Sequence, residues 1–354
     1  MKILYIIHTD WSWIKQRSQF LAENLNSHYQ VKVIYKFSFR RRTLTTNPSE
    51  LVAQPYPFLP FFLRKNYFLT KFDHILGLFF VNIYTKIFAI DCVVVTHPLM
   101  YKYIPKRLPF IYDLHDDNSE FYPNGWLKKL ISSENLTCLG AAAAVLFSSE
   151  YLKSRYNSEN SSRICDVIRN AHSLKEYPMQ AQVKIKKNSK LKIFYFGTIS
   201  EWFRFDLVSG AISKFDNIEF HIIGPSDVKL PMHDRIIYYG SLNHNKMVKI
   251  SMSADAFIMP FEVNELIKGV DPVKFYEYIA FNKPIFTPFY KEIEGYRDFV
   301  QYYDSDDSFY DLVSQFSMGK ISSPDRIKSV GFLNKSRWSD RALQFKEIVD
   351  KVVL

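Results

Sequence analysis

The sequence predicts an α/β protein built from two doubly wound domains, each a parallel β-sheet with helices on both faces. Short apolar segments alternate with longer helical segments from Lys2 to Ile168, and the same alternation starts again at Leu191. Strands that alternate with helices indicate a parallel sheet. Between the two sets, residues 173–190 are polar, rich in lysine and without hydrophobic periodicity, which is typical of a linker. Two such units are expected to face each other across a cleft.

The first domain is expected to span residues 1–172. Its first strand, Lys2–Ile7, is a short apolar run that ends in polar residues and is too short for the apolar core of a signal peptide. By the same patterns we expect further strands at Gln30–Tyr35, Cys92–Thr96, Phe110–Tyr112, Ala144–Ser148 and Ile164–Ile168. Helices are expected at Ile14–Leu25, Leu69–Phe88, Leu127–Gly140 and Glu150–Arg155.

The second domain is expected to span residues 191–337. Its strands are expected at Leu191–Phe196, Glu219–Ile223, Ile236–Tyr239, Ala256–Met259 and Pro284–Thr287. Its helices are expected at Phe205–Lys214, at His244–Ser253 and in the segment around Lys274. A last helix within 338–354 follows Trp338 and Ser339, and we expect it to pack back on the first domain.

Composition limits the class of protein. The chain has 354 residues, 47% of them hydrophobic and 23% charged, which fits two globular domains and excludes a disordered chain. Its 3 cysteines are far apart in the sequence and predict buried thiols in a reducing compartment. No apolar stretch is long enough to span a membrane. We therefore expect a cytoplasmic protein.

A helix that begins near Pro272 carries the strongest functional signal. Asp271-Pro272-Val273-Lys274 follows an apolar strand and a polar loop, and Glu277 lies one turn after Lys274. Proline suits the start of a helix, where free amides and the helix dipole attract anions. Lys274 would add charge for a diphosphate, and Glu277 would suit a ribose diol. The alternative is an ordinary exposed ion pair three residues apart.

Positive charge gathers in one region. The net charge is +10, and between residues 31 and 90 lysines and arginines are mixed with many aromatic residues. Basic and aromatic residues together suit an anionic membrane surface, which we expect Arg40–Arg42 and Arg64-Lys65 to face. The alternatives are a basic loop beside a helix whose aromatics are core, and a nucleic-acid surface, which we do not favour.

Several blocks in order resemble GT-B-fold glycosyltransferases of the bacterial capsule and teichuronic-acid type. They are Trp11-Ser12-Trp13-Ile14-Lys15-Gln16-Arg17, Tyr112-Asp113-Leu114-His115-Asp116-Asp117, Phe147-Ser148-Ser149, Ile168-Arg169-Asn170-Ala171, Phe194–Phe203, Ile223-Gly224-Pro225, Met259-Pro260-Phe261 and Asp271–Tyr278. The last block is also similar to the donor motif of the xanthan glucuronosyltransferase. The likeness covers nearly the whole chain.

The resemblance implies that the C-terminal domain binds a nucleotide sugar, most simply a UDP-sugar, and that the N-terminal domain receives the acceptor. It implies a donor site formed by Gly197, Thr198, Pro272, Lys274, Tyr276 and Glu277. Many retaining members have a glutamate eight residues before the one that matches Glu277, but Gly269 stands there. An inverting mechanism with an aspartate base is therefore slightly favoured. The acceptor is expected to be a lipid-linked saccharide of a surface polysaccharide, at the inner face of the plasma membrane.

The transfer reaction needs a base, and the first domain offers one after the strand at Phe110–Tyr112. Asp116 and Asp117 are adjacent carboxylates that raise each other's pKa, and Asp117 is slightly preferred. His115 is a further candidate for the base or for a contact with the donor sugar. The alternative for the aspartates is a turn that holds loop amides.

Other residues are candidates for contacts with acceptor or sugar, and no cofactor is expected. Trp11, Trp13 and Arg17 follow the first strand, where the tryptophans suit sugar stacking or core packing. Lys274 and helix amides would stabilise the leaving diphosphate without metal. The sequence Asp304-Ser305-Asp306 is interpreted as a turn, so no metal site is expected.

Two other functions stay open at this point. A nucleotide-sugar 2-epimerase would share the two domains and the donor but would need no acceptor. A non-catalytic partner in a polysaccharide assembly complex would fit the glycine at 269.

Overall fold

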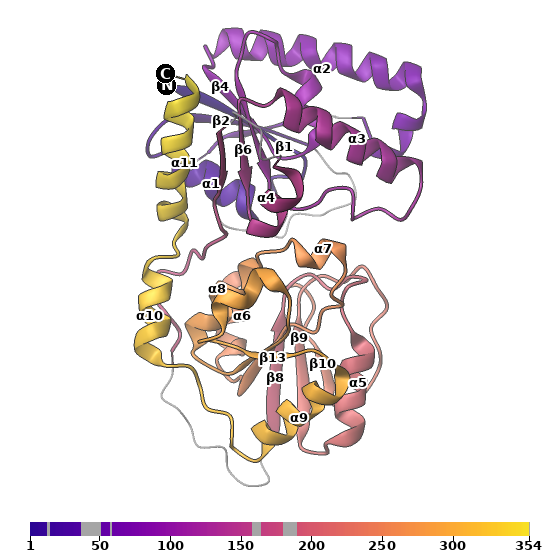
Figure 1. The fold of residues 1–354 in the computed structure, drawn as a ribbon, viewed down its shortest axis with the longest axis vertical. Coiled ribbons are helices and arrows are strands. Elements are labelled where there is room, and N and C mark those ends of the chain that lie inside the picture. The colour runs from indigo at the N-terminus through magenta and orange to yellow at the C-terminus, as the bar shows by residue number, and fades with distance from the viewer. Residues whose placement is uncertain (13–14, 37–50, 57–58, 158–163, 180–189, 354) are drawn as a thin grey trace. The chain divides into compact units, whose positions relative to one another are not determined.

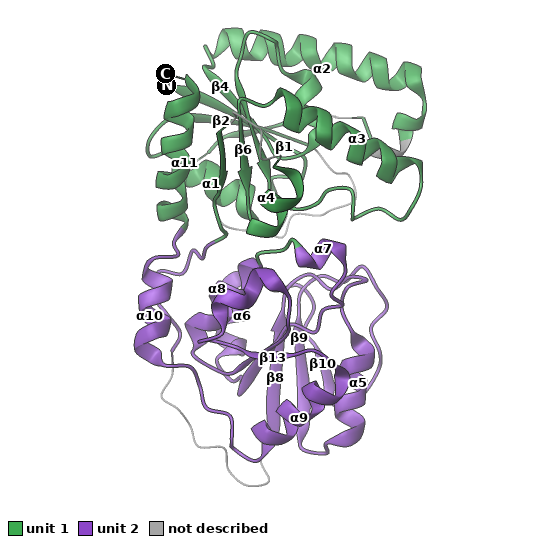
Figure 2. Ribbon diagram, viewed as in Figure 1, with its two compact units in different colours: residues 1–170, 269–271, 338–354 green, residues 171–268, 272–337 purple. Residues whose placement is uncertain are grey.

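The computed structural model describes residues 1–12, 15–36, 51–56, 59–157, 164–179 and 190–353 (Figure 1). The chain divides into two compact units (Figure 2). Unit 1 comprises residues 1–170, 269–271 and 338–354, and unit 2 comprises residues 171–268 and 272–337. The short segment 269–271 thus belongs to unit 1, although the residues on both sides of it belong to unit 2.

Unit 1 is built on a parallel sheet that has seven strands among the described residues, in the order β3-β2-β1-β4-β5-β6-β7. The strands are β1 (Lys2–Ile7), β2 (Gln30–Lys36), β3 (Ala53–Tyr56), β4 (Cys92–Val95), β5 (Phe110–Leu114), β6 (Ala144–Phe147) and β7 (Ile164–Val167). The helices are α1 (Arg17–Leu25), η1 (Phe61–Lys65), α2 (Tyr67–Ile87), η2 (Pro98–Tyr103), α3 (Trp126–Ala141), α4 (Glu150–Tyr156) and α11 (Trp338–Val353).

Helices cover both faces of this sheet. Figure 1 shows α1 and α11 on one side and α2 and α3 on the other. The C-terminal helix α11 packs on α1, where Trp338 stacks on Phe20 with ring centroids 5.1 Å apart. Residues 3–7 of β1 and all of β4 are fully buried, as expected for a parallel sheet that is covered on both faces.

Unit 2 repeats this plan with a parallel sheet of six strands among the described residues, in the order β10-β9-β8-β11-β12-β13. The strands are β8 (Leu191–Phe196), β9 (Ile218–Ile223), β10 (Ile236–Tyr238), β11 (Ala256–Ile258), β12 (Ile285–Pro288) and β13 (Gln301–Tyr303). The helices are α5 (Phe205–Lys214), α6 (His244–Ser251), α7 (Glu265–Lys268), α8 (Val273–Phe281), η3 (Lys291–Tyr296), α9 (Asp306–Ser317) and α10 (Arg326–Asn334).

These strand orders confirm the predicted fold class and indicate where ligands bind. In each sheet the order reverses at one point, between β1 and β4 in unit 1 and between β8 and β11 in unit 2. Ligands of open α/β sheets bind at the carboxyl ends of the strands beside such a point. The candidate functional residues described below lie at these two edges.

Some elements were not expected from the sequence. The edge strands β3 and β13 are short, and Pro55 within β3 lowers its strand signal. Asp304-Ser305-Asp306 is not a simple turn, because Ser305 caps the N-terminus of α9 and Asp306 is its first residue. Among the described residues, no helix combines the length and the hydropathy that a bilayer crossing requires.

Candidate functional site

In unit 2, two glycines shape the carboxyl edge of the sheet. Gly197 follows β8 and Gly224 follows β9, and their backbones are in close contact. The φ angle of Gly224 is +143°, and a Cβ atom placed there would lie 1.8 Å from the carbonyl oxygen of Gly197. Only glycine fits such a position. Glycine at these two positions therefore allows the ends of β8 and β9 to pack backbone against backbone.

Helix α8 begins beside this edge. Pro272 is its N-cap residue, one position before the first helical turn, and its carbonyl oxygen accepts the Phe275 amide at 3.0 Å. The first amides of a helix have no acceptor within the helix. They also lie at the positive end of the helix dipole, so this end favours an anion.

Lys274 and Glu277 form an ion pair on the first turn of α8, and His244 at the start of α6 joins it. The Nζ atom of Lys274 lies 2.9 Å from Oε2 of Glu277, and Nε2 of His244 lies 3.3 Å from Oε1. The Glu277 side chain is 7% exposed, whereas that of Lys274 is 33% exposed. This is therefore not an ordinary exposed pair, because its carboxylate is buried and held from two helices.

The electrostatics of Glu277 follow from these contacts. Burial by itself raises the pKa of Glu277, but the Lys274 ammonium and the His244 imidazole outweigh it and lower the pKa to about 2. The carboxylate is thus ionised at neutral pH, and Lys274 also lies 5.7 Å from the centre of the Phe196 ring. His244 was not identified from the sequence; its position at the start of a helix after Asn243 is its only local signal.

Two other expected donor residues differ in their surroundings. Thr198 is exposed, and its carbonyl oxygen accepts the Tyr195 hydroxyl at 2.6 Å. Tyr276 is fully buried. Its hydroxyl lies 2.8 Å from that of Tyr296, and its ring stacks on Phe332. This side of α8 thus faces the core of unit 2, which gives the Tyr276 side chain a packing role, and its contact with a donor stays a prediction.

In unit 1, three histidines follow three neighbouring strands. His8 follows β1, His97 follows the end of β4, and His115 follows β5. The ring of His8 lies 5.0 Å from that of His97 and 6.1 Å from that of His115, measured between centroids. Burial, with the nearby charges of His8, Lys36, Arg64 and His115, lowers the pKa of His97 well below its ordinary value. His97 is therefore neutral at neutral pH.

Asp116 is the accessible carboxylate beside these histidines. Its side chain is 31% exposed, and its Oδ2 atom lies 3.7 Å from Nε2 of His115. The other ring nitrogen, Nδ1, lies 3.2 Å from the carbonyl oxygen of Asp113. Desolvation raises the pKa of Asp116, with smaller contributions from Asp113 and Asp117, while His115 and Arg17 act in the opposite direction. A raised pKa suits a general base.

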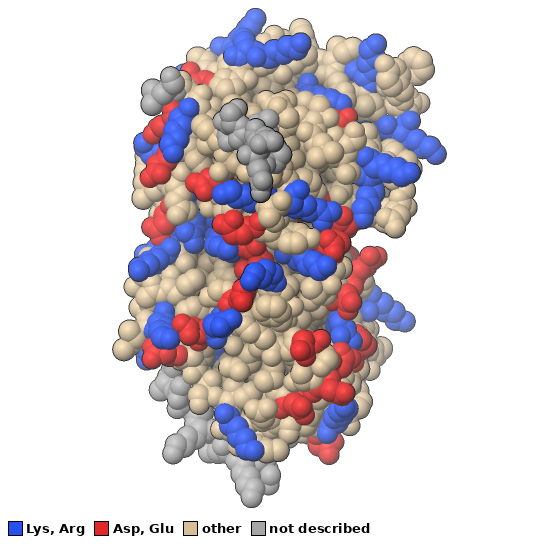
Figure 3. Space-filling view, in the orientation of Figure 1, with Lys and Arg blue, Asp and Glu red and all other residues tan. Residues whose placement is uncertain are grey.

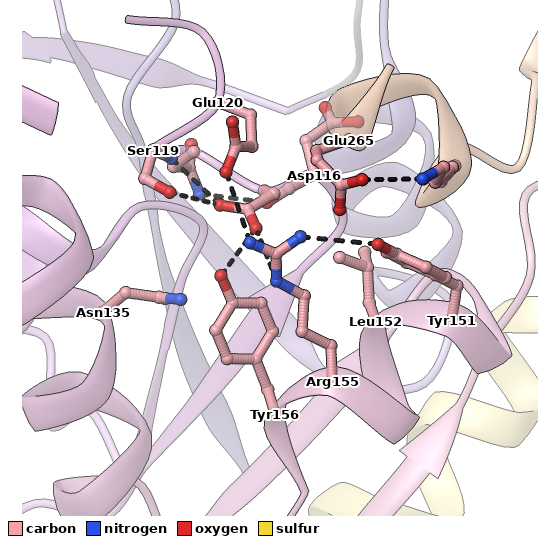
Figure 4. A network of polar contacts seen from close by, with 12 residues as sticks. Asp116, Ser119, Glu120, Asn135, Tyr151, Leu152, Arg155, Tyr156 and Glu265 are labelled. Carbon is pink, nitrogen blue, oxygen red and sulfur yellow. Dashed lines mark hydrogen bonds and ion pairs between the residues drawn. The ribbon is translucent and has the colours of Figure 1, made fainter. Parts of the chain in front are cut away.

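Asp117, slightly favoured from the sequence as the base, is 1% exposed, and both of its carboxylate oxygens accept hydrogen bonds. Its Oδ1 atom accepts the amide and hydroxyl of Ser119, and its Oδ2 atom accepts the Tyr156 hydroxyl at 2.6 Å. Arg155 lies 3.4 Å away, within the network that Figure 4 shows. The structure reverses the preference, because Asp117 holds the loop to α4 while Asp116 remains accessible.

Arg17 is also a structural residue. It is 2% exposed, and its guanidinium donates to the buried Asp113 carboxylate, to the Ile168 carbonyl oxygen at 2.6 Å and to Asn170. These contacts give the Arg17 side chain a structural role, and its contact with acceptor or sugar stays a prediction. Trp11 is half-buried, and its carbonyl oxygen accepts from the Gln19 side chain. Trp13 lies outside the described residues.

The segment 269–271 is anchored within unit 1, just before α8. The Gly269 carbonyl oxygen accepts the Ser149 hydroxyl at 2.8 Å, and the Asp271 carboxylate accepts the Asn170 amide at 2.6 Å. A Cβ atom on Gly269 would lie 3.1 Å from Leu152. The place that many retaining enzymes give to a glutamate is thus closely packed here. Within the described residues, no group of three or more His, Cys, Asp or Glu is placed to hold a metal ion.

Comparison with known proteins links this architecture to glycosyltransferases. No protein-family model and no curated protein matches the sequence. Among solved structures, sucrose-phosphate synthase from Thermosynechococcus elongatus is similar along 99% of both chains, with a TM-score of 0.75 and 12% identity. The lipopolysaccharide outer core galactosyltransferase WaaB in its apo form matches 99% of both chains, with a TM-score of 0.69 and 13% identity.

A third structure was solved with ligands. Anabaena Alr3699/HepE, in complex with UDP and glucose, matches 99% of this chain and 100% of its own, with a TM-score of 0.67 and 12% identity. At these identities the likeness establishes the fold, which is the GT-B fold of glycosyltransferases.

Proposed function

We propose that this protein is a GT-B glycosyltransferase that moves a sugar from a nucleoside-diphosphate sugar, most simply a UDP-sugar, to a hydroxyl of a saccharide acceptor. One observation carries the proposal: the buried Glu277 carboxylate, in the middle of α8, is held by Lys274 of the first turn and by His244. The fold supports it, because the similar structures include a galactosyltransferase and a complex with UDP and glucose.

We assign the binding of the donor to unit 2. The ammonium of Lys274 and the first-turn amides of α8 would bind the diphosphate beside the ends of β8 and β9, which Gly197 and Gly224 shape. A carboxylate has about four acceptor positions, and Glu277 uses two of them for Lys274 and His244. The remaining capacity of Glu277 suits the two hydroxyls of a ribose.

We assign the binding of the acceptor to unit 1. The Asp116 carboxylate would take the proton of the acceptor hydroxyl, and that oxygen would form a bond to the anomeric carbon of the donor sugar. The bond between the anomeric carbon and the diphosphate oxygen would break, and the diphosphate would leave with the electron pair. Lys274 would stabilise the leaving charge, as preorganised cations do in other transferases.

The finer features of the reaction are proposals as well. Metal independence is supported by Lys274 and the helix end, which supply positive charge from the protein itself. Inversion is supported by Gly269, which leaves no carboxylate at the position used by many retaining enzymes. We also propose a lipid-linked acceptor at the inner face of the membrane, in surface polysaccharide synthesis of the capsule type. This part of the proposal rests on the resemblance to the xanthan glucuronosyltransferase and its relatives.

The first test is donor binding. Thermal unfolding should be measured with UDP-, GDP-, dTDP- and CMP-sugars, and one UDP-sugar is expected to raise the melting temperature. A concentration of 100 times Kd should stabilise the fold by about 2.7 kcal/mol. If no nucleotide sugar stabilises the protein, the donor assignment fails.

The second test separates the rival functions. The protein is incubated with the stabilising donor, with and without saccharide acceptors, and nucleotide release and donor configuration are followed. Release that requires an acceptor supports the transferase. An epimerised nucleotide sugar formed without acceptor would indicate an epimerase, and binding without turnover would indicate a non-catalytic partner.

A further inference from the structure

Helix α2 of unit 1 exposes most of its large apolar side chains and buries an acidic residue. The residues it buries are Asp73, Gly77, Val81, Tyr84 and Thr85. Most of its exposed side chains are large and apolar: Tyr67, Phe68, Leu69, Phe72, Ile75, Leu76, Leu78, Phe79, Ile83 and Ile87. An amphipathic helix on the surface of a protein in water normally does the opposite.

The orientation of α2 is fixed by the polar network of Asp73 on its buried face, beside the core residues Val81 and Tyr84. The Asp73 carboxylate pairs with Arg64 at 2.9 Å and also accepts the Tyr103 hydroxyl. Arg64 donates to that same hydroxyl at 2.7 Å. The ring of Tyr103 fills the space in front of Gly77, where a Cβ atom would lie 1.9 Å from it. Turning the apolar face inward would break this network and bury unpaired charges.

The same network corrects an expectation from the sequence. Arg64 was expected to face a membrane together with Lys65, but Arg64 is buried and serves to hold α2. Lys65 is exposed. The other basic group, Arg40–Arg42, lies outside the described residues.

The exposed apolar residues form a continuous stripe. Phe68, Phe72, Ile75, Phe79 and Ile83 follow one another at spacings of three or four residues, which places them on one face of the helix. Their exposure ranges from 40% for Ile83 to 80% for Phe68. Proteins in water rarely expose so long an apolar surface without a partner.

The exposed charged residues of α2, and Lys65 just before it, are all positive. Lys65, Lys71 and Lys86 are exposed, and Asp73, the one acidic residue within the fully described helix Tyr67–Ile87, is buried. On the face of unit 1 drawn in Figure 3, the region of α2 carries blue side chains and few red ones. Two copies of such a face would repel each other through their lysines, whereas an anionic surface would complement it.

We propose that α2 docks on an anionic lipid bilayer and lies in the plane of its surface. The stripe Phe68, Phe72, Ile75, Phe79 and Ile83 enters the boundary between headgroups and acyl chains, and Lys65, Lys71 and Lys86 face lipid phosphates. The helix has 21 residues, about 32 Å, and its composition fits an interfacial helix. This inference states where the proposed enzyme works, and it rests on α2 alone.

The docking face is linked to the candidate acceptor site within the same unit. Because α2 precedes the parallel strand β4, its N-terminal end lies at the carboxyl edge of the sheet, where His8, His97 and His115 are found. Arg64, just before α2, bonds to Tyr103 of η2, which begins immediately after His97. A lipid-linked acceptor held at the bilayer surface would thus be presented at this edge.

The test is sedimentation of the full chain with phosphatidylcholine vesicles, with and without phosphatidylserine. The wild type is expected to bind the anionic vesicles and to be released by salt. The double variant Phe72→Gln/Phe79→Gln should weaken binding roughly a hundredfold, because two aromatic side chains no longer enter the bilayer. The matched control is Met232→Gln/Ile327→Gln, which changes two apolar residues of unit 2 that are 98% and 84% exposed; it should bind like the wild type.

Charge is tested separately. Lys71→Glu/Lys86→Glu should abolish the preference for phosphatidylserine, whereas Lys320→Glu in unit 2 should not. The proposal is overturned if the wild type ignores anionic vesicles at low salt, or if Phe72→Gln/Phe79→Gln binds unchanged. A concentration-dependent dimer that this variant abolishes, without vesicle binding, would assign the face to a second copy of the chain.

Failure of this inference and failure of the proposed function are distinguishable. All variants on α2 should keep the donor-dependent thermal shift of the wild type, since unit 2 is unchanged. Vesicle binding without any donor shift would leave the docking face standing and remove the transferase assignment.

Discussion

Lys274 illustrates how one residue links ligand binding to stability. Lys274→Ala is expected to lower kcat/KM by about 100- to 1000-fold, as the loss of one preorganised transition-state donor does. It should also lower the free energy of unfolding by about 1–3 kcal/mol, because the buried Glu277 carboxylate loses a partner. Steady-state kinetics and chemical denaturation measure the two effects.

A double variant separates the effect on activity from the effect on stability. Lys274→Ala/Glu277→Gln should recover part of the stability, since a neutral amide is easier to bury than an unpaired carboxylate, yet it should stay inactive. Full activity in Lys274→Ala would remove the diphosphate assignment.

The two neighbouring aspartates should give opposite results. Asp116→Asn is expected to abolish transfer with little change in melting temperature, because the side chain is accessible. Asp117→Asn should lower the melting temperature, because Asp117 holds Ser119, Tyr156 and Arg155. Activity that survives in Asp116→Asn would require another base, and His115 is then the next candidate.

The pH dependence of the wild type follows from Asp116. A base acts only when deprotonated, and the pKa of Asp116 is raised, so kcat/KM should fall as the pH is lowered through that raised value. The acid limb should therefore lie above the usual carboxyl pKa of about 4. A pH–rate profile that stays flat down to about pH 4 would contradict this assignment.

At the scale of elements, the contact between the ends of β8 and β9 depends on glycine. Gly224→Ala is expected to destabilise unit 2 by on the order of 3 kcal/mol and to weaken donor binding, because the new methyl group collides with the Gly197 carbonyl and φ is unfavourable. Gly331→Ala, inside α10 and with open space around it, should instead stabilise by about 0.5–1 kcal/mol. Equal effects of the two changes would show that backbone approach at Gly224 is unimportant.

At the scale of the whole molecule, the proposed reaction uses charge from the protein and gives an inverted product. Transfer should therefore persist in EDTA, and the anomeric coupling constant in the NMR spectrum of the product should differ from that of the donor. Loss of activity in EDTA that Mg²⁺ restores would contradict metal independence. Retention of the donor's anomeric configuration would contradict a single displacement with Asp116 as base.

The sequence by itself determined the two α/β units and the helix that carries Lys274. Both signals are local: apolar runs such as Lys2–Ile7 and Leu191–Phe196 have the lengths of buried strands, and Pro272 with Lys274 marks a helix start. Weaker local signals were missed, because the edge strands β3 and β13 are short and His244 stands in no recognisable motif.

Only the tertiary structure decided which polar residues are accessible and which are buried. Asp116 and Asp117 are adjacent and chemically identical, yet long-range contacts with α4 engage one and leave the other open. Arg17 and Tyr276 match family motifs, but Asp113 holds the first and Tyr296 the second inside the core. From the sequence, the aromatic residues of α2 suited either a membrane surface or a buried core, and the network of Arg64, Asp73 and Tyr103 determines which face of the helix points outward. Periodicity along the chain reveals that a helix has two faces, whereas packing against the rest of the unit selects the one that meets the solvent.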